Sequence, residues 1–178
     1  MLYMVELNFA APERAREWED WYSRHLRTLL AMPGFHAVQR FKADAPAASP
    51  FLAIYEIDSP AVLATPEYRA RGGPGTPGEW IPLMVDWHRN IFDGLHPMPA
   101  VRPDEVLILI DRFTSEDPPS PTDVTALKCI GLDRTVHERG LSVCRSGEES
   151  KLLARVNGAR VRVFRPLMDQ MRNPASAQ

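Results

Sequence analysis

The chain has 178 residues, 44% of them hydrophobic and 25% charged, which is the composition of a globular protein with a sizeable core. A net charge of -2 argues against nucleic acid as a main partner, because phosphate binding needs a clustered positive field. No run approaches the ~20 apolar residues of a membrane-spanning helix, and the N-terminus lacks the positive region of a signal peptide. Two cysteines make no disulfide framework. We therefore expect a cytoplasmic protein without a membrane partner.

The first half of the chain predicts the order β-α-β-β-α-β, which is the ferredoxin-like arrangement. Alternating apolar residues indicate the strands, and prolines at 12, 60 and 66 suit the first turns of helices, where a missing N–H does no harm. Strands are expected over 2–9, 35–42, 51–57 and 85–92, and helices over 12–31, 60–64 and from 66 onward.

The helix over 12–31 carries an unusual apolar stripe. Trp18, Trp21, Tyr22 and His25 lie at or beside the i, i+3, i+4 and i+7 positions that face a core. A core helix normally fills such a stripe with aliphatic residues. Rings with polar tips indicate that this stripe borders a region that is apolar and can also form hydrogen bonds.

A proline-rich segment over 97–103 is the best linker in the sequence. The predicted organisation is a ferredoxin-like repeat over 1–96, this linker, a shorter second repeat over 104–167 and a flexible tail over 168–178. In the second repeat the expected elements are strands over 106–111, 137–145 and 160–165, with helices over 122–132 and 148–156. The fold class is thus α+β, a ferredoxin-like α+β barrel with two degenerate repeats whose antiparallel sheets carry helices on one face.

Strand alternation separates two faces of the first sheet. One face is almost wholly apolar and should carry the helices; it includes Phe35, Ala37 and Tyr55. The other face mixes Leu, Met and Ile with polar groups, namely Glu6, His36, Arg40, Glu56, Asp86 and His88. This second face could be an exposed surface, an interface for another sheet, or the interior of a barrel that holds a ligand. Its charges could form a structural ion-pair network or a catalytic site.

The opening strand, the Trp18 to His25 helix followed by Pro33 and Gly34, and the aromatic third strand ending at Glu56 resemble the dimeric α+β barrel superfamily. The most similar groups are EthD-like proteins, stress-responsive barrel proteins and the antibiotic-biosynthesis monooxygenase type. The resemblance covers residues 1–95, and it implies small-molecule metabolism by monooxygenases, cyclases, dehydratases or isomerases, mostly without a cofactor. It also implies a homodimer, although a second repeat in the same chain could close the barrel without a partner.

Candidate catalytic residues fall into two groups. His25, with Tyr22 one turn earlier, could accept and return a proton on an apolar substrate, or it could simply pack and bond a backbone carbonyl. Across the sheet, His88 with Glu6 forms a second candidate, and the same face could instead bind a divalent metal through His36, His88 and a glutamate. We expect neither a metal nor any other cofactor. The expected substrate-binding residues are Trp18, Trp21, His36, Arg40, Tyr55 and Trp87, with Arg40 holding an anionic oxygen.

These patterns favour a cofactor-independent enzyme that uses acid–base chemistry on a hydrophobic, aromatic or polyketide-like small molecule. The alternatives are a ligand-binding or stress-response barrel without catalysis, and a protein-interaction module with a large exposed apolar patch on the sheet.

Overall fold

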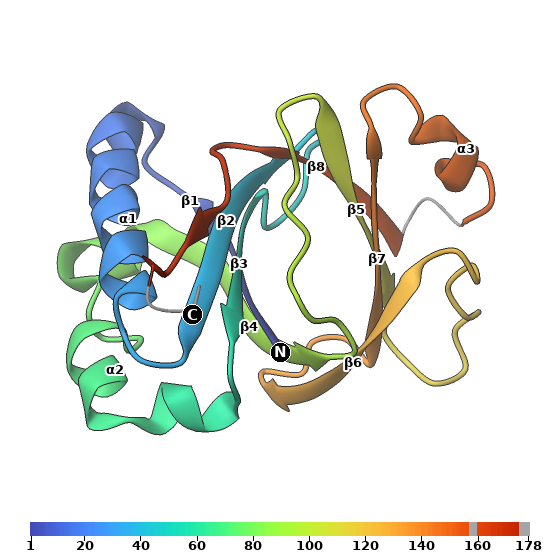
Figure 1. The fold of residues 1–178 in the computed structure, drawn as a ribbon. Helices are drawn as coiled ribbons and strands as arrows, with labels where there is room; N and C mark the ends of the chain where they lie inside the picture. Colours follow the sequence, from blue (N-terminus) through green and yellow to red (C-terminus); the bar gives the residue numbers. More distant parts are fainter. Residues whose placement is uncertain (157–159, 175–178) are drawn as a thin grey trace.

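The computed structural model describes residues 1–156 and 160–174. Within them, eight antiparallel strands close into one barrel in the order β3-β1-β4-β6-β7-β5-β8-β2, and β2 pairs back onto β3 (Figure 1). The strands are β1 (Leu2–Phe9), β2 (Phe35–Ala43), β3 (Phe51–Ile57), β4 (Met84–Asp93), β5 (Glu105–Arg112), β6 (Thr125–Leu132), β7 (Glu138–Arg145), β8 (Val161–Pro166) and β9 (Met171–Arg172), and the helices are α1 (Ala15–Leu30), α2 (Pro66–Arg71) and α3 (Ser150–Leu153). Short 3-10 helices cover Pro12–Arg14, Pro60–Ala64 and Gly78–Leu83.

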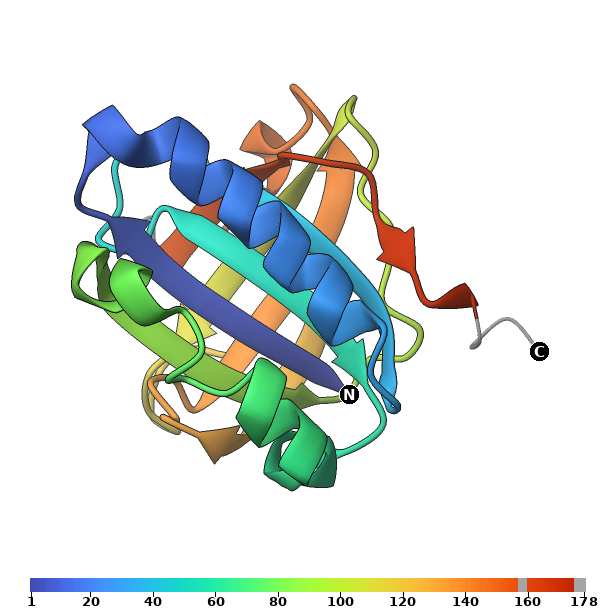
Figure 2. The same cartoon turned by 90° about the vertical axis from the view of Figure 1, so that its left-hand side faces the viewer.

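Helices α1 and α2 lie on the outer face of the first-half strands, as Figure 2 shows. The aromatic stripe explains the position of α1, since Trp18, Tyr22 and Leu26 are all buried against the sheet. The helix is followed by a tight turn at Gly34, whose φ is 84° and where an added Cβ would lie 2.5 Å from Val62. None of the described helices is long and apolar enough to cross a membrane.

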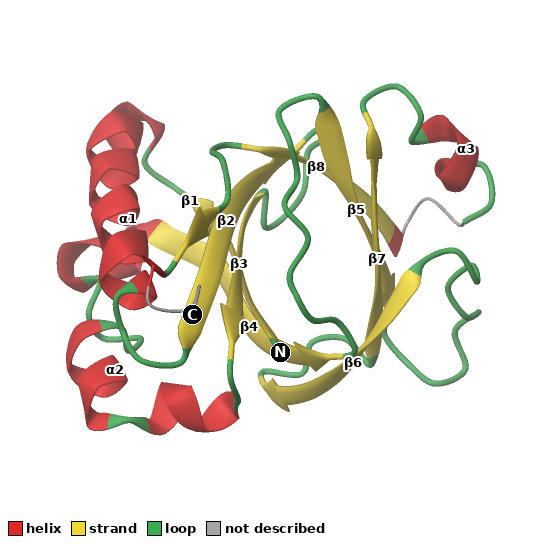
Figure 3. Ribbon diagram, in the orientation of Figure 1, coloured by secondary structure: helices red, strands yellow, loops and turns green. Residues whose placement is uncertain are grey.

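The α+β barrel expected from the sequence is present and closes within one chain, but the two ferredoxin-like repeats expected within it are not what the structure shows. Figure 3 shows most of the helical residues on one side of a single closed barrel, with only α3 on the other side. The helix expected over 122–132 is wrong, because this segment is strand β6, which bridges β4 and β7 and so closes the sheet. Its apolar residues at 124, 127 and 130 have helical spacing, yet Leu127 points into the barrel while Ala126 and Lys128 are exposed. A helix is present within the range expected over 148–156, but it is the shorter α3, Ser150–Leu153.

Aliphatic and aromatic side chains fill the middle of the barrel, and its two ends differ. At one end the segment over 95–103, which includes the expected linker, folds across the opening: Met98 and Val101 are 2% and 3% exposed. The Gln39 side-chain amide donates a hydrogen bond to the Val101 carbonyl and accepts one from the Val101 N–H. These two bonds hold the segment over 95–103 in place, and we call this segment the plug. The far end is charged instead. There, Glu6, Asp111, Arg139 and Arg162 form a closed ring of ion pairs, the charged tetrad.

A bulge in β2 overturns part of the expected face assignment. The register between β2 and β3 shifts between Phe35 and Ala37, so every later side chain of β2 changes face. Ala37 and Phe41 therefore point into the barrel, whereas Arg40 lies on the α1 side, opposite to the expectation.

The C-terminal segment is not a free tail over its described part. Met171 and Arg172 form β9, which pairs with β2 at Val38 and Ala37, and the Asn173 N–H donates to the His36 carbonyl. The rest of the expected tail, 175–178, lies outside the described residues.

A candidate active site between helix α1 and the sheet

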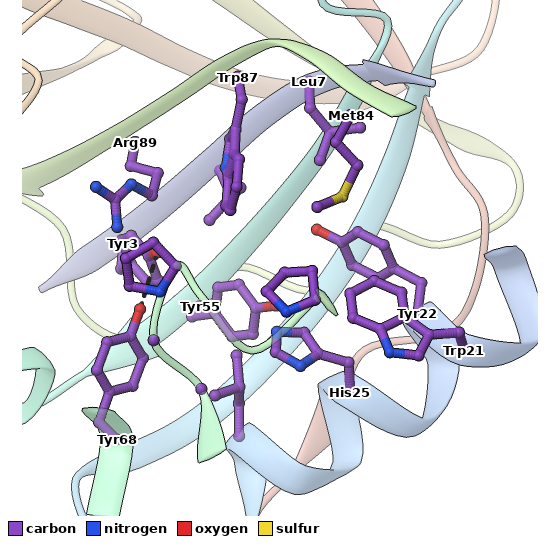
Figure 4. A pocket seen from close by; sticks show the side chains of 16 residues that line it. Tyr3, Leu7, Trp21, Tyr22, His25, Tyr55, Tyr68, Met84, Trp87 and Arg89 are labelled. Carbon is purple, nitrogen blue, oxygen red and sulfur yellow. Dashed lines mark hydrogen bonds between the residues drawn. The ribbon is translucent and has the colours of Figure 1, made fainter. Parts of the chain in front are cut away.

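A pocket lies between α1, the outer face of β1, β3 and β4, and the loop that follows α2 (Figure 4). Because α1 faces this part of the sheet through the rings of Trp21, Tyr22 and His25 as well as through leucines, the two layers leave a slot with polar atoms around it. The labelled side chains of Figure 4 come from four elements and the α2 region: Tyr3 and Leu7 from β1, Trp21, Tyr22 and His25 from α1, Tyr55 from β3, Met84, Trp87 and Arg89 from β4, and Tyr68 from α2.

His25 is the histidine that lines this pocket. Its ring stacks on Trp21 with centroids 5.0 Å apart and meets Tyr22 edge-on at 6.1 Å. Among the described residues neither ring nitrogen has a hydrogen-bond partner, so the expectation of a bond to a backbone carbonyl is not met. Burial lowers the pKa of His25 to about 4. At neutral pH the side chain is therefore an uncharged imidazole with an available lone pair, which can accept a proton.

Four phenols line the same slot as two pairs. The hydroxyls of Tyr3 and Tyr68 lie 3.2 Å apart, and Tyr22 and Tyr55 are close enough for each to influence the pKa of the other. Burial raises the pKa of all four, so each remains a protonated hydroxyl that can donate to an anion.

The strand β4 contributes two further donors. The indole nitrogen of Trp87 is buried and has no partner among the described residues, and Figure 4 shows its ring projecting into the pocket from the side opposite His25. Arg89 lines the far end, where its positive charge acts against the rise in the pKa of Tyr68. An unpaired buried N–H typically costs about 1–3 kcal/mol, so its presence in a pocket indicates a group that a ligand satisfies.

A glycine- and proline-rich loop covers the pocket. Gly72 packs so closely that an added Cβ would lie 2.2 Å from Leu29 of α1 and 3.0 Å from Tyr68. Pro74 and Pro77 complete the cover. The Thr76 hydroxyl donates a hydrogen bond to the Gly73 carbonyl of the same loop at 2.8 Å. The cavity beneath is only about 30 Å³, roughly the volume of one water molecule. A ring-sized ligand therefore needs the loop to lift.

The structure brings together five of the residues selected from the sequence, and these are Trp21, Tyr22, His25, Tyr55 and Trp87. Two others lie behind the pocket wall, contrary to expectation. Trp18 is 1% exposed and stacks on Phe9 at 4.5 Å. Arg40 pairs with Glu19 and lies 4.0 Å from the centre of the Tyr22 ring, so it supports that ring instead of facing a substrate.

The second expected site is only partly assembled. Glu6 and His88 line a cavity at the charged end of the barrel, far from His25 on the other face of the sheet. His36 is not with them, because it bonds Asp58 at 2.5 Å near the plugged end. Burial opposes ionisation of Glu6, but Arg139 and Arg162 outweigh it and lower its pKa to about 2. Both oxygens of the Glu6 carboxylate are taken by these guanidinium groups, which favours the ion-pair network among the two roles expected for this face.

The other expected site residues have structural surroundings of their own. Glu56 lies inside the barrel and contacts His96 at 2.5 Å.

Among the described residues no group of three or more His, Cys, Asp or Glu side chains could hold a metal ion. His36 and His88, which one alternative took together as metal ligands, lie apart from each other. Cys129 and Cys144, both half-buried, carry free thiols.

Sequence reasoning missed Tyr3, Tyr68, Met84 and Arg89. Tyr3 and Met84 could have been found by pairing, since β1 and β4 are neighbours and both residues share the face that packs on the helices. Tyr68 and Arg89 gave no comparable signal. Tyr68 lies on a helix of only six residues, and Arg89 has the pattern of an ordinary charged residue of a strand.

Comparison with known proteins supports the fold. No family model matches the chain, and no curated protein sequence matches it significantly. Two solved structures are similar throughout: an anthrone oxidase-like protein, with a TM-score of 0.59 and 11% identity over 98% of this chain and 94% of that one, and a candidate monooxygenase from Lactobacillus acidophilus NCFM, with a TM-score of 0.50 and 10% identity over 94% of both. At this identity the likeness shows the fold alone, an α+β barrel.

Proposed function

We propose that this protein is an oxygen-dependent oxidase or monooxygenase of a planar hydroxyaromatic or polyketide-like small molecule, and that it works from the pocket under α1. The fold it shares with an anthrone oxidase-like protein and a candidate monooxygenase supports an oxidase-like reaction. The single observation that carries the proposal is His25, an uncharged imidazole without a hydrogen-bond partner in the described chain, facing a slot of aromatic rings.

The substrate class follows from the walls of the pocket. Aromatic rings on both sides favour a flat ring system through stacking, and the hydroxyls around it favour oxygen substituents. An anthrone-type ketone has both properties, and in addition its ring CH₂ group is acidic enough for a histidine to deprotonate.

Each of the pocket residues then has its own role in the reaction. His25 accepts a proton from the acidic C–H, which leaves a substrate anion whose charge is concentrated on oxygen. The Trp87 N–H and the phenols of Tyr22 and Tyr55 donate hydrogen bonds to that oxygen and so stabilise the anion. The carbanion form reduces dioxygen, forms a C–O bond and yields a hydroperoxide, which loses water. In sum, CH₂ and O₂ give C=O and H₂O, and His25 returns its proton.

Closure of the loop serves the same chemistry. With the loop lifted the substrate can enter, and with Gly72 packed on Leu29 bulk water is excluded from the anion. A dry site strengthens the hydrogen bonds that hold the charge.

Oxygen uptake with an anthrone-type substrate tests the proposal. We expect the wild-type protein to consume one O₂ per substrate, and His25→Ala to lower kcat at least about 100-fold. His88→Ala is the matched control, since His88 is an exposed histidine at the barrel end, and it should retain wild-type turnover. Binding of the substrate without any oxygen uptake by the wild-type protein would instead favour a non-catalytic ligand-binding barrel. Equal loss in both variants would contradict the role of His25.

A further inference from the structure

The charged end of the barrel contains a second, larger cavity that the proposed reaction does not use. Its volume is about 260 Å³, several times the free space under α1. It opens at the end of the barrel away from the plug, and we call it the mouth cavity. Its walls come from β1, β4, β5, β7, β8 and the loops beside them.

The floor of the mouth cavity is the charged tetrad. Arg139, which is 1% exposed, donates through Nε to Asp111 at 2.6 Å and through Nη1 to Glu6 at 2.5 Å. Arg162 bonds the other oxygen of each carboxylate. Both acids therefore have both oxygens occupied by guanidinium groups.

Donors remain on the side that faces the cavity. A guanidinium has five N–H donors. Glu6 and Asp111 bond two of the Arg162 nitrogens, and the Arg162 side chain keeps 23% exposure. Arg160 pairs with Asp117 at 3.1 Å and with the Pro118 carbonyl at 3.0 Å, but its Nε is buried without a partner in the described chain. Since Asp117 lies outside the lining, the cavity is walled by three guanidiniums and two carboxylates.

The lining also contains apolar side chains. They are Ala47, Ala48, Val136 and Phe113, and Phe113 is 55% exposed. A large aromatic side chain so open to solvent beside unpaired arginine donors is suited to stack on a ring whose substituent is an anion. Because Glu6, Asp111 and Asp117 already pair with the three guanidiniums, the few N–H donors that remain suit a single carboxylate better than a doubly charged phosphate.

We propose that the mouth cavity is a binding site for a small aromatic carboxylate, whose carboxylate is held by Arg160 and Arg162 and whose ring packs on Phe113 and Val136. The planar fork of arginine matches a carboxylate in two parallel hydrogen bonds. The site lies on the face of the sheet opposite to the pocket of His25, so its occupancy does not depend on the proposed oxidation.

Calorimetric titration of the full chain with benzoate tests this site. We expect benzoate to bind the wild-type protein, and Arg160→Gln to raise the dissociation constant about tenfold, because one charge-assisted hydrogen bond is lost. Arg155→Gln is the matched control, as Arg155 is an exposed arginine paired with Asp123 outside the cavity, and it should leave binding unchanged. Phe113→Ser, which changes a side chain that is already exposed, should also weaken binding, and it keeps the test valid should Arg160→Gln fold poorly.

Three outcomes would overturn the proposal. One is absence of benzoate binding to the wild-type protein. Another is binding that Arg89→Gln abolishes and Arg160→Gln leaves intact, since benzoate would then occupy the pocket under α1. The third is tighter binding of inorganic phosphate than of benzoate, which would assign the arginines to a different anion.

Discussion

The pocket under α1 and the mouth cavity are built on the same two strands, β1 and β4, but on opposite faces of them. On the outer face Tyr3 and Trp87 contact a pocket in which polar groups lack charged partners. On the inner face Glu6 belongs to a tetrad in which every carboxylate oxygen is paired. Strand alternation produces this contrast. The comparison teaches that a buried polar group without a partner indicates chemistry, whereas a paired one indicates stability.

The tetrad should contribute far more to stability than any surface ion pair. Replacing Arg139 by Met leaves two buried carboxylates without their inner cation, which we expect to destabilise the fold by about 3–5 kcal/mol. Urea unfolding measures the loss. Arg155→Met removes an exposed pair and should leave the unfolding midpoint nearly unchanged. Equal, small effects of the two changes would mean that the tetrad is not a structural unit.

The pH dependence of stability should show the tetrad as well. The folded pKa of Glu6, about 2, lies below the ordinary value of 4.5, so its stabilisation is present above about pH 4.5 and is lost as the pH falls toward 2. The difference corresponds to roughly 3 kcal/mol. Urea titrations at a series of pH values should show this loss in the wild-type protein and a flatter dependence in Glu6→Gln. The same acid sensitivity in both proteins would assign it to other groups.

The loop over the pocket offers a comparison between two glycines. Gly72→Ala forces a Cβ against Leu29 and Tyr68, and we expect it to cost about 1–3 kcal/mol and to raise KM by loosening the cover. Gly75→Ala adds a Cβ that meets nothing within 4 Å and should change neither quantity. Thermal unfolding and steady-state kinetics measure both. Identical behaviour of the two variants would contradict a packed cover.

The unpaired indole should matter for turnover and not for folding. Trp87→Phe removes only the ring N–H from the wall, so we expect kcat to fall about tenfold while stability stays the same or rises slightly. The matched change is Trp18→Phe, which removes the other buried unpaired indole N–H outside the pocket lining. If Trp18→Phe lowers kcat as much as Trp87→Phe, the effect is one of packing.

Local pattern predicted much of the first half. The strands β1 and β3 and the long helix followed from apolar periodicity, and the aromatic stripe correctly placed His25 beside a pocket. The bulge in β2 was not predictable from alternation, and it moved Arg40 to the wrong face. A barrel was expected, but its closing strand β6 was missed, because β6 has helical apolar spacing and only its pairing with β4 and β7 makes it a strand. Long-range pairing also assembled Tyr68 and Arg89 with His25, and no local signal carries that information.

The pH profile of kcat/KM tests most directly that the neutral His25 is the working base. Its pKa, lowered by burial to about 4, predicts activity that stays level from pH 8 to about pH 5 and falls on the acid side with a midpoint near 4. A midpoint near 6.5, the ordinary value of a solvated histidine, would contradict the account, since it would place the essential base outside this pocket.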